Sequence, residues 1–109
     1  MKKAFRIKKA TEIEHVMQNG SVVRNKHLKV FKKENHDNRH FRFAVSVPKK
    51  YGNAVERNKM KRRIRMIVSQ QTIKQTDDFF VVIHPAAKAL DFESLKQVLE
   101  KALTKLSIR

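Results

Sequence analysis

The chain has 109 residues, enough for one domain with a modest core, and 40% of them are hydrophobic. It contains 26 Lys and Arg against 10 Asp and Glu, which gives a net charge of +16, and it contains no cysteine. This composition excludes disulfides, thiolate metal sites and a cysteine nucleophile. So large an excess of positive charge is typical of small domains that bind nucleic acid or an anionic membrane.

The positive charge is concentrated in the first two-thirds of the chain. Residues 1–65 contain 20 basic and 5 acidic side chains, a net charge of +15, whereas residues 66–109 contain 6 and 5, a net charge of +1. Charge that served only solubility would be scattered, so we predict a polyanion-binding surface within residues 1–65. No stretch is apolar and long enough to span a membrane, and we expect a soluble cytoplasmic protein without a membrane partner.

The first predicted elements are a basic arm and a short helix. Five Lys and Arg side chains precede residue 10. Thr11 and Glu14 have the spacing of a capping box, apolar residues follow at helical intervals, and Gly20 is a typical helix stop. The pattern therefore predicts a helix over about 11–19, preceded by a positively charged segment.

Two strands are expected next, at 28–31 and at 41–47. In the second strand, apolar residues alternate with polar or small ones, which is the period-2 pattern of a half-buried strand. We expect the polar segment 34–40 to connect the two strands as an antiparallel pair. The sequence leaves open whether a further short strand forms at about 21–25.

The second half of the chain predicts a strand, helix, strand unit and a final helix. Pro48 ends the second strand, a helix is expected over about 54–70, and the apolar run 79–83 has the character of an interior strand. This order implies a parallel crossover between the two strands. Asp91 is the expected N-cap of the last helix, which has one apolar face.

These elements predict an α+β fold, an α/β sandwich in which helices cover a four-stranded sheet, as a single RNA-binding domain over residues 1–109. The order of elements is αβββαβα if the short strand at 21–25 forms, and αββαβα otherwise.

The segment 57–65 holds six positive charges and no negative charge, directly after the Gly52-Asn53 turn. At about 100° per residue, a helix here has two stripes. The apolar stripe, expected to be buried, consists of Met60, Ile64, Ile67 and Val68. The polar stripe consists of Arg57, Asn58, Lys61, Arg62 and Arg65. An amide among charges adds directional hydrogen bonds that fix the register of phosphates; the alternative is a solvated face with an Asn that bonds its own backbone.

Residues 46–65 read S-V-P-K-K-Y-G-N-A-V-E-R-N-K-M-K-R-R-I-R. This segment resembles the signature of the bacterial ribonuclease P protein subunit, S-V-x-K-K-x-G-N-A-V-x-R-N-x-x-K-R-x-x-R, and it matches that signature at every named position. The opening F-R-I-K-K at residues 5–9 is similar to the aromatic-Arg-Leu/Ile start of the family. The resemblance therefore extends over nearly the whole chain.

The resemblance implies an α/β sandwich with a left-handed βαβ crossover. It also implies that the chain is one of two subunits of a ribonucleoprotein that removes the 5′ leader of precursor transfer RNA by Mg²⁺-dependent phosphodiester hydrolysis. In that family, a large catalytic RNA holds the metal ions and performs the chemistry. We therefore expect two partners, the catalytic ribonuclease P RNA and precursor transfer RNA. No obligate protein partner, no tightly bound Mg²⁺ and no catalytic residue are expected on the chain itself.

The resemblance further implies two groups of site residues. Those expected to bind the catalytic RNA are Lys49, Lys50, Asn53, Arg57, Asn58, Lys61, Arg62 and Arg65. Those expected to line a cleft for the single-stranded leader are Phe5, Arg6, Ile13, Met17, Phe31, Phe43, Val45 and Val47. Relatives usually carry aromatic rings at positions 13, 17 and 31, where this chain has one, and core packing is the alternative role for Ile13 and Met17. His84 stands where many relatives carry Arg, which makes that contact absent or pH-sensitive.

Other kinds of site fit the sequence less well. The five histidines lack metal-binding spacing and have no cysteine beside them. The acidic pair Asp77-Asp78 lies at the start of a predicted strand, where turn chemistry explains it, so a protein-only nuclease is not expected. A non-enzymatic RNA-binding protein, such as a ribosomal protein or RNA chaperone, remains the second function class. Only a ribonuclease P subunit should prefer precursor over mature transfer RNA when its partner RNA is present.

Overall fold

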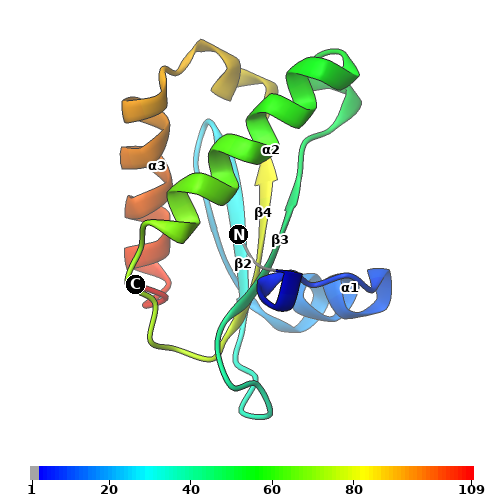
Figure 1. Cartoon of the computed structure of the whole chain (residues 1–109), viewed down its shortest axis with the longest axis vertical. Helices are drawn as coiled ribbons and strands as arrows, with labels where there is room; N and C mark the ends of the chain where they lie inside the picture. Colours follow the sequence, from blue (N-terminus) through cyan, green and yellow to red (C-terminus); the bar gives the residue numbers. More distant parts are fainter. Residues whose placement is uncertain (1–2) are drawn as a thin grey trace.

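The computed structural model describes residues 3–109, and Figure 1 shows their arrangement. The elements are η1 (Lys3–Phe5), α1 (Ala10–Asn19), β1 (Ser21–Arg24), β2 (Leu28–Lys33), β3 (Arg42–Ser46), η2 (Lys49–Tyr51), α2 (Ala54–Ser69), β4 (Asp78–Ile83), η3 (Pro85–Ala89) and α3 (Phe92–Lys105), where η marks a 3₁₀ helix. The α+β class and the αβββαβα order are confirmed, including the short strand that the sequence left open. No helix in this part of the chain is long and apolar enough to cross a membrane.

The four strands form one sheet in the order β1-β2-β4-β3. β1 pairs with β2 and β2 pairs with β4, both antiparallel, whereas β3 pairs with β4 in parallel. The expected antiparallel pairing of β2 with β3 is therefore wrong, because β4 lies between them. The reason is hydrophobic burial: β4 is almost entirely buried along its length, and a central place in the sheet covers both faces of a strand.

The β3-α2-β4 unit is a parallel crossover, as predicted. In Figure 1 both strands run up the page, α2 crosses in front of the sheet, and β4 lies to the left of β3. This arrangement is a left-handed crossover, the hand that the resemblance implies and the opposite of the usual one. It places the basic helix beside β3, at one edge of the sheet.

One face of the sheet carries the main core beneath α2 and α3. The strands contribute buried residues in alternate positions, which include Leu28, Val30, Phe43, Phe79, Val81 and Ile83. The helices contribute Met60, Ile64, Ile67, Val68, Leu95, Leu99, Ala102 and Leu103. The predicted apolar stripe of the basic helix and the apolar face of the last helix are therefore confirmed.

The opposite face of the sheet is covered in part by α1, which packs against β2 and β4. Arg42 of β3 points to this side and donates to Glu12 of α1, with Nη2 2.7 Å from Oε2. Strand pairing places Phe31, Phe80 and Ala44 side by side on the same face. Of this row, Phe31 and Ala44 are partly exposed, whereas Phe80 is buried.

α1 begins one residue earlier than predicted, with Lys9 at the N-cap and no side-chain cap. The predicted capping box of Thr11 and Glu14 is therefore wrong, because Thr11 lies within the first turn rather than before it. The predicted stop is confirmed at Gly20. A Cβ at this position would lie 2.2 Å from the Lys32 carbonyl oxygen, so the close approach of helix end and strand requires glycine.

The N-terminal segment runs along the outer edge of β3. Arg6 forms an isolated parallel bridge with Phe43, and the Ile7 N–H donates to the Phe43 carbonyl oxygen at 2.9 Å. The segment covers part of an edge whose backbone groups would otherwise be unpaired. It also brings Arg6 close to α1 and α2.

Candidate nucleic-acid interface

The basic helix α2 is fixed at its N-terminus by a capping box. The Asn53 Oδ1 accepts from the Glu56 N–H at 2.9 Å, and the Glu56 carboxylate accepts from the Asn53 N–H at 3.0 Å. The other Glu56 oxygen lies 2.7 Å from Nζ of Lys88, and the hydrogen bonds from Lys88 and the Asn53 backbone lower the pKa of Glu56. Asn53 thus starts the helix, and its side-chain NH₂ group is the donor that remains for the RNA contact expected of it.

The polar stripe of α2 lies together on one side of the helix, as its spacing predicts. Arg57, Lys61 and Arg65 are half-buried at intervals of four residues, whereas Asn58 and Arg62 are exposed. No salt bridge among residues 3–109 involves any of the four cations. Within the described residues, the positive charges of the stripe therefore have no carboxylate in direct ion-pair contact.

Lys49 and Lys50 extend this basic surface beyond the start of α2, and both are exposed in η2. Lys50 and His84 line a hollow of about 240 Å³ near the ends of β3 and β4. The His84 Nδ1 accepts from the Ala86 N–H at 3.0 Å and so caps η3. The Nε2–H of the neutral ring is then the group that remains for a contact, whereas protonation of Nδ1 would break the cap.

A second hollow, here called the β3-edge hollow, lies between the N-terminal segment, α1, β3 and α2. Its volume is about 140 Å³, and it is lined by Arg6, Ile7, Ile13, Phe43, Ala44, Val45 and Arg65. Four of these residues are among those expected in the leader cleft, and Arg65 is among those expected to bind the catalytic RNA. The structure therefore joins, at this hollow, two surfaces that the sequence kept apart.

Three other residues expected in the leader cleft lie outside this hollow. Phe31 is half-buried, and its ring stacks on that of Phe80 with the centroids 6.2 Å apart. Met17 is 43% exposed, so it belongs to the surface of α1 rather than to the core. Phe5 packs against the ring of His40 at a centroid separation of 4.1 Å. Each of the three therefore keeps some accessible apolar surface near the sheet or its edge.

Two residues expected in the leader cleft are buried in the core, and of these only Phe43 also borders the β3-edge hollow. Val47 is 5% exposed and Phe43 is 1% exposed, with the ring of Phe43 stacked on Phe79 at 5.4 Å. Strand alternation explains the error, because Phe43, Val45 and Val47 share the face beneath α2, and only Val45 is partly accessible. Ala44, which points to the α1 side and lines the hollow, is the residue that the same alternation could have identified.

The acidic pair Asp77-Asp78 is bound within the chain. Asp78 accepts hydrogen bonds of 2.8 to 3.0 Å from the side chains of Arg42, Asn35 and Asn38. Burial opposes the ionisation of Asp78, but these hydrogen bonds outweigh it and lower its pKa. Burial raises the pKa of Asp77, which lies 3.6 Å from Nζ of Lys32. Both carboxylates therefore have structural partners.

The donor set of the described residues does not fit a Mg²⁺ ion held by the protein. Mg²⁺ requires carboxylate or carbonyl oxygens in a near-octahedral arrangement. No group of three His, Asp or Glu side chains within residues 3–109 could hold a metal ion. The one adjacent acidic pair already accepts hydrogen bonds and an ion pair from the chain.

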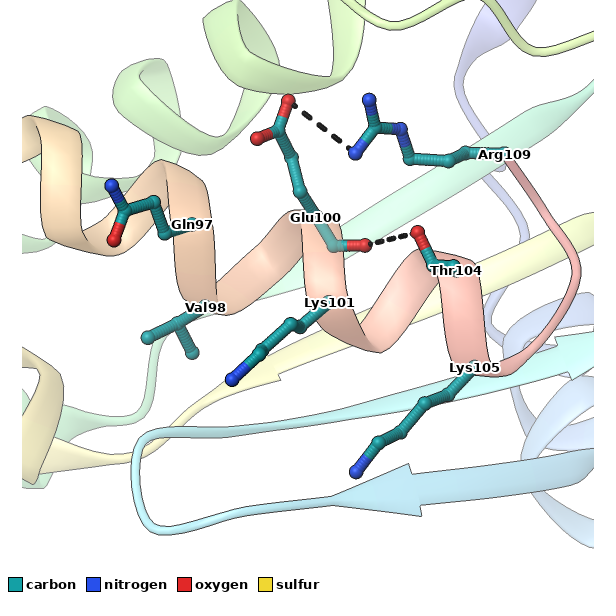
Figure 2. Close-up of a pocket in the computed structure, with 7 residues that line it drawn as sticks. All are labelled: Gln97, Val98, Glu100, Lys101, Thr104, Lys105 and Arg109. Atoms are coloured by element: carbon teal, nitrogen blue, oxygen red, sulfur yellow. Dashed lines mark hydrogen bonds and ion pairs between the residues drawn. The ribbon is translucent and has the colours of Figure 1, made fainter.

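A larger hollow, of about 550 Å³, lies on the outer side of α3 (Figure 2). Its lining consists of Gln97, Val98, Glu100, Lys101, Thr104, Lys105 and Arg109. Figure 2 shows Glu100 turned toward Arg109, at 3.7 Å, and Lys101 extending away from this pair. The hollow contains none of the predicted site residues, and its two lysines, Lys101 and Lys105, belong to α3.

Comparison with known proteins decides the family. The family model described as Ribonuclease P matches residues 1–107. The chain belongs to the ribonuclease P protein family. A ribonuclease P protein component from Macrococcus caseolyticus is 37% identical over 106 residues, which cover 94% of this chain and 90% of the relative.

Solved structures of ribonuclease P proteins have the same fold. The protein from Staphylococcus aureus is 35% identical with a TM-score of 0.89, over 97% of this chain and 98% of that chain. The protein from Thermotoga maritima is 23% identical with a TM-score of 0.83, over 92% and 96%, and supports the fold alone. Membership of the ribonuclease P protein family implies a role in processing the 5′ end of transfer RNA and an RNA partner.

Proposed function

We propose that the chain binds a catalytic ribonuclease P RNA and the 5′ leader of precursor transfer RNA, and so supports Mg²⁺-dependent removal of the leader by that RNA. The observation that carries this proposal is the junction at Arg65, where the polar stripe of α2 meets the β3-edge hollow. The stripe supplies cations for a folded RNA, and the partly exposed Phe31 ring and the exposed Met17 side chain supply apolar surface for a single strand.

The protein contributes binding and orientation rather than acid-base chemistry. The guanidinium groups of Arg57, Arg62 and Arg65 suit phosphate oxygens because each presents a planar fork of donors, and Asn58 adds a donor and an acceptor with fixed directions. Binding both RNAs on adjoining surfaces makes their encounter effectively intramolecular. Mg²⁺ held by the catalytic RNA would supply Lewis-acid and water-activating chemistry at the scissile phosphodiester.

Cleavage of a precursor transfer RNA at low Mg²⁺ by a bacterial ribonuclease P RNA, with and without this chain, tests the proposal. We expect accurate 5′ cleavage only when both components are present, because cations of the chain replace part of the charge neutralisation that Mg²⁺ alone must otherwise provide. Activity of the chain alone would place the chemistry on the protein. No stimulation of the RNA would favour the second function class, a non-enzymatic RNA-binding protein.

Phe31→Ala should lower the affinity of the holoenzyme for precursor transfer RNA by about 1–3 kcal/mol, the range for loss of one base-stacking ring, and leave assembly with the catalytic RNA nearly unchanged. The dissociation constants for precursor and mature transfer RNA give the leader-dependent part as a ratio. Phe92→Ala is the matched control, since it removes a half-buried ring at the start of α3, away from the α1 face. Equal losses for both RNAs in Phe31→Ala would show that its ring is structural.

A further inference from the structure

The two edges of the sheet differ in how the chain covers them. The N-terminal segment covers part of the outer edge of β3, through the bridge between Arg6 and Phe43. No residue within 3–109 pairs with the outer edge of β1. Three of the four residues of β1 are exposed, and Val22 is 39% exposed. An unpaired edge is a template for another strand, so β1 is the place where the sheet could be extended.

The register of β1 and β2 shows which backbone groups point away from the sheet. The Asn25 N–H donates to the Leu28 carbonyl oxygen at 2.9 Å, so these two residues form a hydrogen-bonded pair at the turn. Along an antiparallel ladder, hydrogen-bonded and non-hydrogen-bonded pairs alternate. Val22 and Arg24 therefore occupy non-hydrogen-bonded positions opposite β2. Their N–H and C=O groups point to the open edge, where they can pair with another backbone.

A hollow of about 330 Å³, here called the α3–β1 groove, adjoins this edge between β1, the β1-β2 turn and α3. Its apolar lining consists of Val23, Val98 and Ala102. Its cations are Arg24, Lys26, Lys101 and Lys105. Figure 2 shows the two lysines of α3 extending toward the β1-β2 hairpin. The groove therefore combines an apolar lining with four positive charges beside an open strand edge.

The positive charges of the groove have no partner within residues 3–109. None of the four cations forms a salt bridge there. The carboxylate of the neighbouring hollow, Glu100, already accepts from Gln71 at 2.9 Å and lies 3.7 Å from Arg109. The groove is also distant from the polar stripe, because α3 packs against β1 while α2 packs against β3, at the opposite edge of the sheet (Figure 1). It is a second basic surface, suited to an anionic partner.

We propose that the open edge of β1 and the α3–β1 groove together bind an extended acidic segment of another protein, which adds a strand to the sheet. This inference goes beyond the proposed function and does not depend on it. A peptide backbone supplies acceptors for the N–H groups and donors for the C=O groups of Val22 and Arg24, whereas the phosphates of RNA only accept. Among the described residues that line the groove, none is a Phe, Tyr or Trp on which bases could stack.

The two faces of β1 determine which side chains the added strand should carry. Val23 lies opposite Val30 of the core and so faces α3, whereas Val22 points to the other side. Side chains of the added strand that face α3 meet Lys101 and Lys105, and those on the other side meet the exposed Val22. Because strand side chains alternate between faces, the segment should alternate Glu or Asp with apolar residues.

The charge of the chain also favours an acidic protein over a second copy of itself. A second copy would bring its own net charge of +16 to an edge that is already positive. Like charges brought together in this way oppose association. The four residues of β1 offer only a few hydrogen bonds, so the partner should bind transiently rather than as a permanent subunit.

Titration of the whole chain with a synthetic peptide, followed by NMR of the backbone amides, tests the proposal. The probe has the sequence Val-Glu-Val-Glu-Val-Glu-Val and is blocked at both ends. We expect the Val22 and Arg24 amide protons to shift downfield with one dissociation constant, because each gains a hydrogen bond. Unchanged signals at both positions, with the peptide bound elsewhere or not at all, would overturn the proposal.

N-methylated versions of the peptide separate strand pairing from attraction between charges. One version is methylated on the backbone nitrogens of its valines and the other on those of its glutamates, so both keep the same charge. Only alternate N–H groups of an added strand point toward β1. One version should therefore bind about 10-fold more weakly or worse, and the other should bind like the unmethylated peptide. Equal binding of the two versions would overturn the proposal.

Two variants of the chain place the peptide at the groove. Arg24→Ala and Lys105→Ala should each weaken peptide binding about two- to fivefold, the range for an exposed ion pair. Both side chains are exposed, so neither change should disturb the fold. Arg62→Ala is the matched control, since it removes an exposed arginine from the polar stripe of α2 and should leave the affinity for the peptide unchanged. An equal effect of Arg24→Ala and Arg62→Ala would mean that overall charge attracts the peptide, and would overturn the site.

The same amide signals distinguish the other possible occupants of the edge. The chain is titrated with a short oligonucleotide of uridines, and the free chain is diluted in a separate series. Shifts of the Val22 and Arg24 amides at lower concentrations of oligonucleotide than of peptide would assign the edge to RNA. Shifts of these amides on dilution would assign it to a second copy of the chain, and either result would overturn the proposal. None of these measurements uses cleavage, so failure of this site and failure of the proposed function give different results.

Discussion

The affinity of the chain for a bacterial ribonuclease P RNA should fall about a thousandfold when the salt concentration rises from about 50 to about 200 mM. Six cations lie on the basic surface, namely Lys49, Lys50, Arg57, Lys61, Arg62 and Arg65. Each phosphate that they neutralise releases counterions, so log K should decrease with log salt at a slope of about −5. Equilibrium binding measured at four or more salt concentrations gives this slope.

Two single variants show whether the slope belongs to the α2 surface. Arg62→Ala should reduce its magnitude by about one, because Arg62 is exposed on the polar stripe. Lys101→Ala removes the same charge from the hollow on α3 and should leave the slope unchanged. A shallow slope in the wild-type chain, or equal changes in both variants, would mean that binding depends on overall charge or on other contacts.

Asp78→Asn should lower the free energy of unfolding by about 3 kcal/mol, the lower end of the range for breaking a buried ion pair. The wild-type carboxylate is almost fully buried and accepts hydrogen bonds from Arg42, Asn35 and Asn38. An amide removes the charge and turns one acceptor into a donor, whereas Arg42 keeps its bond to Glu12. Denaturant titration at pH 7 measures the loss. Asp37→Asn, an exposed change in the nearby loop, should stay within about 0.5 kcal/mol.

The difference in unfolding free energy between the wild-type chain and Asp78→Asn should depend on pH. The pKa of Asp78 is lower in the folded chain than its ordinary value of 3.8, so the unfolded chain binds this proton more tightly. The stability that Asp78 contributes is therefore complete above about pH 4 and is lost as the pH falls through the lower folded pKa. Asp77, whose pKa burial raises, acts in the opposite direction and is common to both proteins. The difference between wild type and Asp78→Asn should therefore shrink below pH 4, and a constant difference would contradict the assigned role.

The features that could be predicted from the sequence depend on local periodicity. The buried stripe and the polar stripe of α2 follow from the spacing of residues three and four positions apart. The cap at Asp91 is equally local, since its Oδ1 accepts from the Ser94 N–H at 2.7 Å. The side chains of β3 follow the same kind of rule, because alternation alone separates Ala44 from its apolar neighbours. Applying alternation strictly would have removed Phe43 and Val47 from the predicted cleft.

The features that could not be predicted depend on contacts between distant segments. The residues of β2 and β3 do not show that a later strand lies between them. The strand order depends instead on the burial of β4, which favours a central place in the sheet. The meeting of Arg6 with Arg65 likewise depends on the path of the N-terminal segment along the sheet edge. The candidate site could thus be predicted as a set of residues but not as one connected surface.

The central position of β4 determines when the sheet can form. Of the strand ladders, only β1 with β2 involves strands near each other in sequence, and the other two both require residues 78–83. During synthesis on a ribosome, the β1-β2 hairpin can therefore form early, while β3 and the basic helix have no partner strand to close against. Such non-local pairing makes folding slow. Most of the positive charge of the chain is synthesised before β4, so the nascent chain carries this charge beside ribosomal RNA while its sheet is still incomplete. The time at which β4 inserts therefore determines how long the unfolded basic segment is exposed to non-specific RNA binding.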